Sequence, residues 1–144
     1  MKFIAIETIT DICSISLFDS DKKIDLLETS EDFAHSKNLP VLFNKIIKKN
    51  KISISSLQFV AISIGPGSYT GIKIGVNFTK GLAYSLNIPI VPVNSIDSLN
   101  FSINQKGKYY IALFSHKDYI FYQEFKDGLA KSKQICDKVL KLNK

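Results

Sequence analysis

Hydrophobic residues in the first third of the chain occur in short runs that predict β-strands. Residues 2–8 are apolar and β-branched, residues 12–18 alternate between apolar and polar side chains, and residues 23–29 form a weaker run. Short polar turns separate these runs, and strands joined by such turns usually pair in antiparallel fashion. The pattern therefore predicts an antiparallel meander.

Helical spacing replaces this alternation from about residue 36 to residue 49. The apolar positions that recur at helical spacing are Leu39, Leu42, Phe43, Ile46 and Ile47. Ser36 or Asn38 is a suitable N-cap, and Pro40 would fall in the first turn, where its missing N–H costs little. An amphipathic helix is the predicted structure.

A glycine-rich loop lies between a buried strand and a second helix. The apolar run at 59–64 leads into Gly-Pro-Gly-Ser-Tyr-Thr-Gly at 65–71, and a helical pattern continues to about residue 86, before a short apolar run at 90–93. A helix that connects two such strands makes a right-handed crossover, which places the strands parallel. The order βββαβαβ predicts an α/β fold with a mixed sheet and helices packed on it.

The C-terminal part is expected to be smaller. Residues 95–103 suit a helix, and residues 109–125 contain two alternating runs joined by a polar turn, which predicts a β-hairpin. The lysine-rich stretch 129–144 is expected to be a loosely held helix or a frayed tail. We therefore divide the chain into an N-terminal half-domain, 1–100, and a truncated remnant of a second half-domain, 101–144.

Composition places the chain among ordinary globular proteins. It has 144 residues, of which 45% are hydrophobic and 22% charged. No apolar run is long enough to span a bilayer, and Glu7 interrupts the N-terminal run too early for a signal peptide, so we expect a cytoplasmic protein without membrane contact. Cys13 and Cys136 form no CxxC or zinc pattern and are expected to be free thiols.

Positive charge is concentrated in the middle of the chain. The net charge is +6, and every basic residue is a lysine. Residues 33–96 contain seven lysines and no acidic residue, whereas residues 1–32 contain eight acidic residues and three lysines. This asymmetry fits a surface for nucleic acid or for an acidic partner, and it fits a solvated lysine-rich surface equally well.

The glycine loop raises the question of phosphate binding. Glycines followed by a helix N-terminus can cradle an anion. The loop nevertheless lacks the Walker A pattern, because Gly71 is followed by Ile72, and its GxGxxxG spacing differs from the Rossmann GxGxxG. The alternative is a tight strand-to-helix turn in which Gly71 and Gly75, on one helix face, allow another helix to approach closely.

Other candidate chemistry is sparse in the sequence. His35 and His116 form no HxxxH or HExxH motif, and no cluster supplies the further ligands that a metal site needs. There is no GxSxG nucleophile motif. Glu7, at the end of the first predicted strand, is a candidate catalytic or metal-binding carboxylate or a turn residue.

Three segments, in the same order, resemble the TsaB family, which is also called YeaZ. GPGSYTGIKIG at 65–75 resembles the family's glycine signature, FIAIETITDICSISLF at 3–18 resembles its opening strands, and FAHSKNLP at 33–40 resembles its His-Ser region. The resemblance covers about residues 1–125. It implies an actin-like, ribonuclease-H-like fold with two related halves, of which the second is reduced in this chain.

The resemblance also implies a function. Members of this family are identified as non-catalytic dimerisation subunits that pair with TsaD, a catalytic paralogue with a metal-binding HxxxH. Together with the ATPase TsaE, they form N6-threonylcarbamoyladenosine at position 37 of tRNAs that read ANN codons. By this reading the chain is not an enzyme, has no cofactor of its own, meets ATP or ADP and tRNA only within the complex, and forms a homodimer in isolation.

Site residues follow by carry-over from the family. A weak nucleotide-binding set at the partner interface would comprise Glu7, Thr8, Gly65, Gly67, Ser68 and Thr70. The family's Asp-Thr-Ser is Glu-Thr-Ile at residues 7–9 here, which weakens nucleotide binding by this subunit alone. Partner contacts are expected from the two helices, at His35, Leu39, Phe43, Gly71, Ile72, Gly75, Val76 and Thr79.

Two other functions stay open. One is a metal-dependent, glycoprotease-like peptidase or an ATPase, which would need a metal constellation or a complete phosphate turn. The other is a standalone tRNA-binding module, which would need aromatic side chains beside the lysines on a β surface. The aromatic residues of the sequence mostly fit core positions, so this module is the least favoured.

Overall fold

The N-terminal part of the chain folds as a mixed sheet. A computed structural model describes residues 1–30 and 34–139, and the strands β1 (Lys2–Glu7), β2 (Cys13–Asp19) and β3 (Lys22–Thr29) form its predicted antiparallel meander. β4 (Leu57–Ser63) lies parallel to β1, and β5 (Ile90–Val93) lies parallel to β4. The predicted parallel pairing of β4 and β5 is thus confirmed, with the strand order β3-β2-β1-β4-β5.

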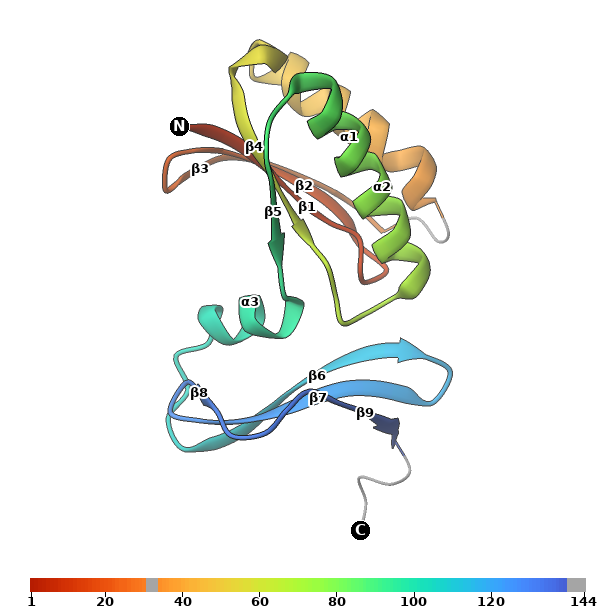
Figure 1. The fold of residues 1–144 in the computed structure, drawn as a ribbon, viewed down its shortest axis with the longest axis vertical. Coiled ribbons are helices and arrows are strands. Elements are labelled where there is room, and N and C mark those ends of the chain that lie inside the picture. Colours follow the sequence, from red (N-terminus) through yellow and green to blue (C-terminus); the bar gives the residue numbers. More distant parts are fainter. Residues whose placement is uncertain (31–33, 140–144) are drawn as a thin grey trace.

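Two helices cover one face of this sheet. Helix α1 (His35–Lys49) and helix α2 (Tyr69–Leu86) lie side by side on it, and a short 3-10 turn, Ile54–Ser56, precedes β4 (Figure 1). Alternate strand residues point toward the helices, as expected for a half-covered sheet. The resulting core contains Ile4, Ile6, Ile15, Leu17, Leu39, Ile46, Val60 and Ile62.

Helix α1 begins differently from the prediction. It starts at His35 after Ala34, no side chain caps it, and Ser36 lies inside the helix. Pro40 is also inside the helix, beyond the first turn. The predicted N-caps were therefore wrong, because the start of α1 is held by a tertiary contact in which His35 Nε2 donates to the carbonyl oxygen of Thr10 at 2.7 Å.

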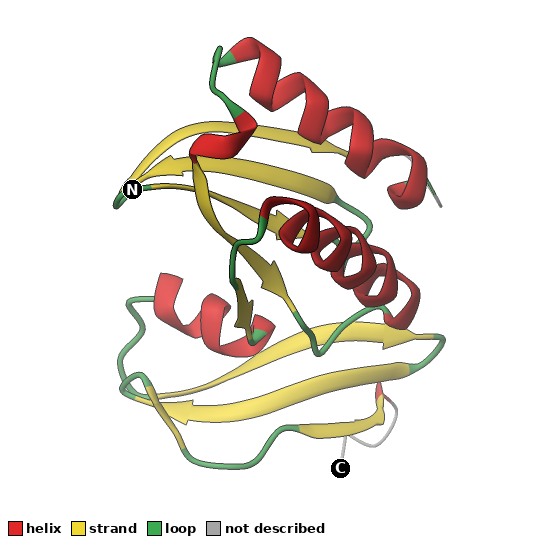
Figure 2. Cartoon of the chain, turned by 45° about the horizontal axis from the view of Figure 1, so that its top comes forward, coloured by secondary structure: helices red, strands yellow, loops and turns green. Residues whose placement is uncertain are grey.

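The C-terminal part forms a second, antiparallel sheet. Helix α3 (Ser95–Ser102) lies between the two sheets, and the predicted hairpin is formed by β6 (Lys108–His116) and β7 (Tyr119–Lys126) (Figure 2). Ile96 of α3 packs against Ile111 and Phe125 of this hairpin in a separate small core.

The prediction for the C-terminal stretch was wrong where the structure describes it. Residues Leu129–Ala130 form β8 and residues Ile135–Lys138 form β9, and both strands pair with β7. Ser132 supports this arrangement, because its hydroxyl accepts from the backbone N–H of Glu124 at 3.1 Å. The hairpin offers an open β7 edge, which orders a segment that has no strong pattern of its own. The remainder of the expected tail, 140–144, lies outside the described residues.

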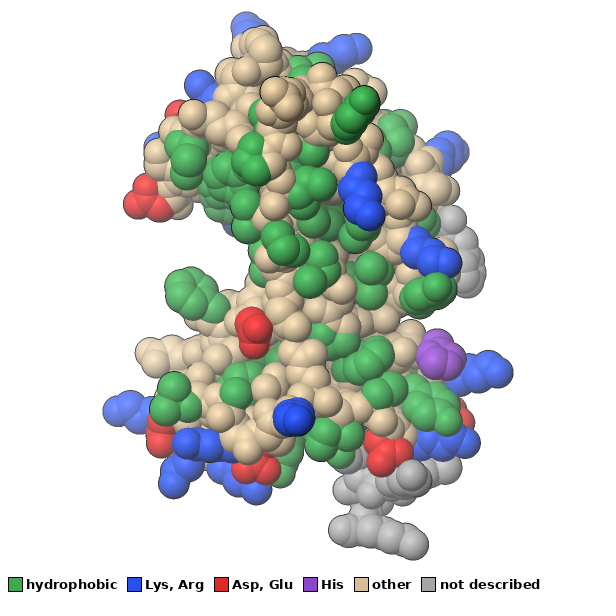
Figure 3. Space-filling view, viewed as in Figure 1, with side chains coloured by type: hydrophobic (Ala, Val, Ile, Leu, Met, Phe, Trp, Pro, Cys, Tyr) green, Lys and Arg blue, Asp and Glu red, His purple; other side chains and the backbone are tan. Residues whose placement is uncertain are grey.

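The waist between the two sheets is the narrowest part of the molecule. Figure 3 shows the surface hollowed at this level on both sides. The connection there includes a hydrogen bond from the backbone N–H of Ser95 to the carbonyl of Gly65, at 2.9 Å. Within the described part of the chain, no helix is both long enough and apolar enough to cross a bilayer.

Candidate functional site

The glycine loop docks on the turn between β1 and β2. Gly65 has a φ of +93°, a left-handed conformation that favours glycine. A Cβ on Gly67 would lie 2.7 Å from the Cβ of Ile9, so the close approach of the two segments also requires glycine. The backbone N–H of Ser68 donates to the carbonyl of Ile9 at 2.8 Å. These contacts bring the signature loop and the opening motif into one site.

Two polar residues of the β1–β2 turn hold this site together. The Glu7 carboxylate accepts from the backbone N–H of Ile9 at 2.6 Å and from the hydroxyl of Ser63. Thr8 is fully buried, and its hydroxyl donates to the carbonyl of Gly71 at 2.8 Å. Both side chains are therefore engaged in bonds within the chain.

Two glycines of α2, Gly71 and Gly75, face the end of strand β1. A Cβ on Gly71 would lie 1.8 Å from the carbonyl oxygen of Thr8, and a Cβ on Gly75 would lie 2.3 Å from the Thr8 hydroxyl oxygen. The idea that these glycines admit another helix is thus wrong, because the space beside them is filled by the chain's own strand. They let the N-terminal half of α2 lie directly on the end of β1.

A pocket opens where the three motif segments converge. It has a volume of about 370 Å³ and lies between the β1–β2 turn, the start of α1 and the start of α2. His35 borders it, and its second ring nitrogen, Nδ1, is buried without a hydrogen-bond partner. The lining residues are Thr10, Asp11, His35, Ser36, Ser68, Thr70, Gly71 and Ile74. Phe33 of the His-Ser segment lies outside the described residues.

Of the predicted nucleotide-binding residues, only Ser68 and Thr70 line this pocket. The Ser68 hydroxyl caps α2 by accepting from the N–H of Gly71 at 3.2 Å. Gly65 and Gly67 are buried, and Thr70 is exposed at the pocket. The pocket therefore offers the hydroxyl of Thr70 and backbone N–H groups of the first turn of α2. The carboxylate of Asp11 also lines it, and its negative charge would repel a bound anion.

The predicted partner contacts lie on α1 and α2, but most are buried in the chain itself. His35, Ile72 and Val76 are half-buried, and Val76 packs against the main core. The other predicted positions have little surface to offer a partner, since they pack between the helices and the sheet: Leu39, Phe43, Gly71, Gly75 and Thr79. Helical spacing in the sequence identified the apolar face of each helix. It did not show which residues of the two helices stay exposed once that face packs on the sheet.

The outer surface of the two helices carries a groove that sequence reasoning missed. Phe43 and Phe78 meet edge to face in it, with ring centroids 5.8 Å apart. Its volume is about 450 Å³, and its lining consists of Pro40, Phe43, Asn44, Asn77, Phe78, Gly81, Leu82 and Ser85. Gly81 could have signalled this groove, since a glycine inside an exposed helix costs stability. A Cβ there would meet nothing within 4 Å.

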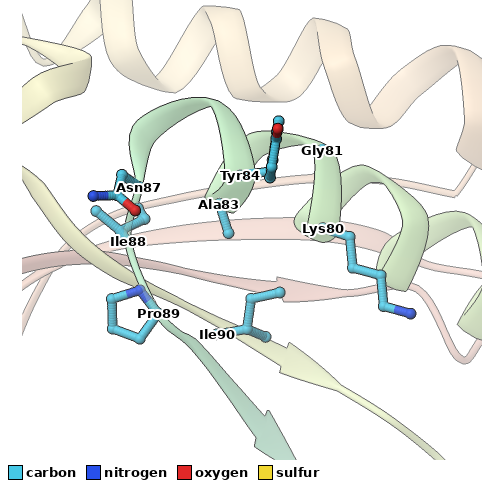
Figure 4. Close-up of a pocket in the computed structure, with 8 residues that line it drawn as sticks. All are labelled: Lys80, Gly81, Ala83, Tyr84, Asn87, Ile88, Pro89 and Ile90. Atoms are coloured by element: carbon cyan, nitrogen blue, oxygen red, sulfur yellow. The ribbon is translucent and has the colours of Figure 1, made fainter.

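The groove continues toward a shallow hollow at the C-terminal end of α2. Figure 4 shows Ala83 pointing toward Ile90 of β5, whereas Tyr84 points away from the strand. Tyr84 is 91% exposed. This hollow contains no carboxylate, histidine or cysteine, so it offers surface for contact rather than a catalytic set.

The two cysteines are free thiols. Cys13 is buried in β2, and burial, followed by the nearby negative charge of Glu7, raises the pKa of its thiol. It therefore stays neutral and behaves as a core residue. Cys136 is exposed on β9.

Comparison with known proteins identifies the family. The family model described as "TsaD: tRNA N6-adenosine threonylcarbamoyltransferase" matches residues 30–126. The chain belongs to this family. Among curated relatives, a TsaB protein of Buchnera aphidicola from Schizaphis graminum is 29% identical over 98% of this chain and 74% of its own length. A TsaB protein of Haemophilus influenzae is 21% identical over 86% of this chain. Both relatives are TsaB proteins, so the chain is similar to this branch of the family.

Solved structures show the same fold. A Pseudomonas aeruginosa protein described as similar to peptidase YeaZ has a TM-score of 0.80 at 17% identity and covers 95% of this chain. The activator of 2-hydroxyisocaproyl-CoA dehydratase from Clostridium difficile, solved with bound ADPNP, has a TM-score of 0.58 at 8% identity. The fold is thus actin-like and ribonuclease-H-like, as predicted. The chain spans 53% of the Haemophilus protein and 66% of the Pseudomonas structure.

Proposed function

We propose that the chain is a non-catalytic subunit of the machinery that forms N6-threonylcarbamoyladenosine in tRNA. Its relatives bear the name of this biosynthesis, and its family model carries the name of the transferase. By extension from the family, the partner is a TsaD-type subunit, TsaE completes the complex, and the modified nucleoside is adenosine 37. ATP or ADP would bind only within that complex.

The engagement of Glu7 and Thr8 within the chain supports a non-catalytic role. In a catalytic or phosphate-handling turn, these groups would face a ligand. Here they hold the glycine loop against β1 instead, through bonds to Ile9, Ser63 and Gly71. The peptidase and ATPase alternatives would need these polar groups to be free.

The groove between α1 and α2 is the observation that carries the proposal of a partner subunit. It combines the half-buried Phe78 and Leu82, which lie over the buried Phe43, with polar residues, and this is the usual composition of a protein interface. Val41, which follows the lining residue Pro40 in α1, is 57% exposed. A helix of the catalytic subunit would bury this apolar surface, and a second copy of the chain would use the same groove in a homodimer.

Gly81→Arg tests this interface. Because a side chain at residue 81 meets open space in the monomer, the substitution should leave the fold intact and fill the groove. We expect co-purification with the TsaD of the same organism to fall at least about tenfold, which corresponds to about 1.4 kcal/mol of binding free energy. Gly81→Ala is the matched control and should bind normally.

The readout is a light-scattering mass of the mixed proteins, followed by threonylcarbamoyl transfer in the presence of TsaE and the adenylate donor. A complex of unchanged mass and affinity with Gly81→Arg would refute the groove as the interface. Absence of any complex with the unmodified chain would refute the partner-subunit proposal itself.

A further inference from the structure

A second concave site lies at the waist, on the other side of the glycine loop. The start of α2 forms one wall and the tip of the β6–β7 hairpin forms the other, around a cavity of about 500 Å³. We call it the waist slot; it is lined by Pro66, Gly67, Tyr69, Ile72, Ser115, His116 and Phe121. Its floor is apolar, and its size suits a flat aromatic ligand.

Aromatic rings stand at both walls of the waist slot. Tyr69 is 71% exposed, although it belongs to the signature loop. On the opposite wall, the His116 ring stacks on Tyr119 with centroids 5.3 Å apart and an interplanar angle of 15°. His116 is exposed and Tyr119 behind it is half-buried, so the rings of Tyr69 and His116 are the accessible ones, and exposed aromatic rings are platforms on which nucleic-acid bases stack.

Two lysines lie over these rings, and a third is in the adjacent hairpin turn. Lys73 Nζ of α2 lies 4.3 Å from the centroid of Tyr69, and Lys138 Nζ of β9 lies 5.6 Å from the centroid of Tyr119. Lys117 follows His116 in the hairpin turn, where Asp118 is the acidic neighbour. Figure 3 shows lysine and histidine side chains around the hollow on the right of the waist. Bases bound between the rings would thus have cations beside their phosphates.

We propose that the waist slot binds a base of single-stranded RNA, stacked against Tyr69, with its phosphates beside Lys73, Lys117 and Lys138. The choice of RNA rests on the proposed role in tRNA modification. The aromatic residues on a β surface that a tRNA-binding module requires are present here, since His116 and Phe121 belong to β6 and β7. This departs from the expectation that the aromatic residues fill core positions.

The test is fluorescence anisotropy with the chain alone and a labelled RNA hairpin whose single-stranded loop contains adenosine. A fully paired RNA duplex of the same length is the comparison. We expect the hairpin to bind more tightly than the duplex, because duplex bases cannot enter the slot. Tyr69→Ala should weaken hairpin binding about five- to a hundredfold, and Tyr69→Phe should retain it.

Tyr84→Ala provides a matched control. It removes an exposed tyrosine from the same helix, but from the end that lies away from the slot. It should leave RNA binding unchanged. Lys73→Gln should reduce the slope of log affinity against log salt concentration by about one. Circular dichroism of each variant shows whether it is folded.

Several results would overturn the assignment. One is equal affinity for hairpin and duplex, and another is an equal effect of Tyr69→Ala and Tyr84→Ala. Displacement of the hairpin by adenosine monophosphate at concentrations near the Kd of the RNA would assign the slot to a free nucleotide. A homodimer that Tyr69→Ala dissociates would assign it to a protein contact. None of these readouts involves TsaD, so they fail or succeed separately from the Gly81→Arg test.

Discussion

Glycines within α2 illustrate how differently one residue type can behave along a single helix. Gly71 and Gly75 meet Thr8 of the β1–β2 turn at distances that exclude a side chain, whereas Gly81 faces open space. The first two allow the helix to contact the strand end. The third leaves an opening on the outer surface.

Alanine substitutions should separate these roles. Gly71→Ala places a Cβ against a backbone oxygen, so we expect a loss of at least about 2–3 kcal/mol in the free energy of unfolding. Gly81→Ala should instead raise it by about 0.5–1 kcal/mol, because alanine favours the helix. Urea unfolding measures both. Equal effects would contradict the close approach of α2 to β1.

The buried threonines provide a second test at the residue scale. Thr8 and Thr79 are both fully buried, but only the Thr8 hydroxyl has a hydrogen-bond partner, the carbonyl of Gly71, whereas that of Thr79 has none. Thr8→Val should therefore cost about 1–2 kcal/mol, and Thr79→Val should be neutral or stabilising. Thermal unfolding of the two variants and of the unmodified chain measures these changes in stability. The reverse order would mean that Thr8 does not anchor the loop.

At the scale of elements, α1 depends on contacts at its two ends. His35 bonds to the β1–β2 turn at its start. At its end, the Asp25 carboxylate of β3 accepts from Lys49 Nζ at 2.9 Å and from the Asn50 side chain at 2.8 Å. No side chain caps the start of the helix, so its N-terminal end is positioned by the β1–β2 turn, whereas at its C-terminal end Asn50 also donates to the carbonyl of Ile46 at 2.9 Å.

The Asp25 contact predicts a dependence of stability on acid. Hydrogen bonds from Lys49, and then from Asn50, hold the pKa of the Asp25 carboxyl below its usual value of about 3.9. The folded chain thus binds this proton less readily than the unfolded chain, and the stabilisation is present above about pH 4 and lost as pH falls further. Asp25→Asn should flatten the loss of stability between about pH 5 and pH 3. The measurement is the free energy of unfolding from urea denaturation at a series of pH values. An equal loss of stability with falling pH in the variant and in the unmodified chain would contradict the prediction.

At the scale of the whole molecule, the two proposed surfaces lie at different places on α2. Tyr69 is its first residue, and Gly81 lies twelve positions further, about 18 Å along the axis. The waist slot needs both sheets, because α2 and the hairpin supply its opposite walls. The groove needs only the two helices of the first sheet.

This separation predicts independent effects. Gly81→Arg should weaken the TsaD complex and leave binding of the RNA hairpin unchanged, whereas Tyr69→Ala should do the reverse. Sites more than about 10 Å apart without shared partners usually act additively, so the double variant should lose both activities by the same factors. Anisotropy and co-purification on the same protein preparations measure this. Loss of both activities in either single variant would mean that the surfaces are one site.

The sequence by itself determined the succession of strands and helices in the first sheet, the glycine loop and the family. Local periodicity suffices for these, because the alternation at residues 12–18 and the helical spacing at residues 36–49 each reflect one buried face. The resemblance in turn depends on short motifs whose order along the chain is visible without coordinates.

Only the tertiary structure decided what each face meets. Periodicity shows that Leu39 and Thr79 share the apolar side of a helix, but it cannot tell whether a partner or the chain's own sheet covers that side. Likewise, β9 forms because β7 offers an open edge, which residues 135–138 do not encode locally. Contacts between distant segments, such as Thr8 with Gly71, depend on the whole fold, and they decide which residues remain available for function.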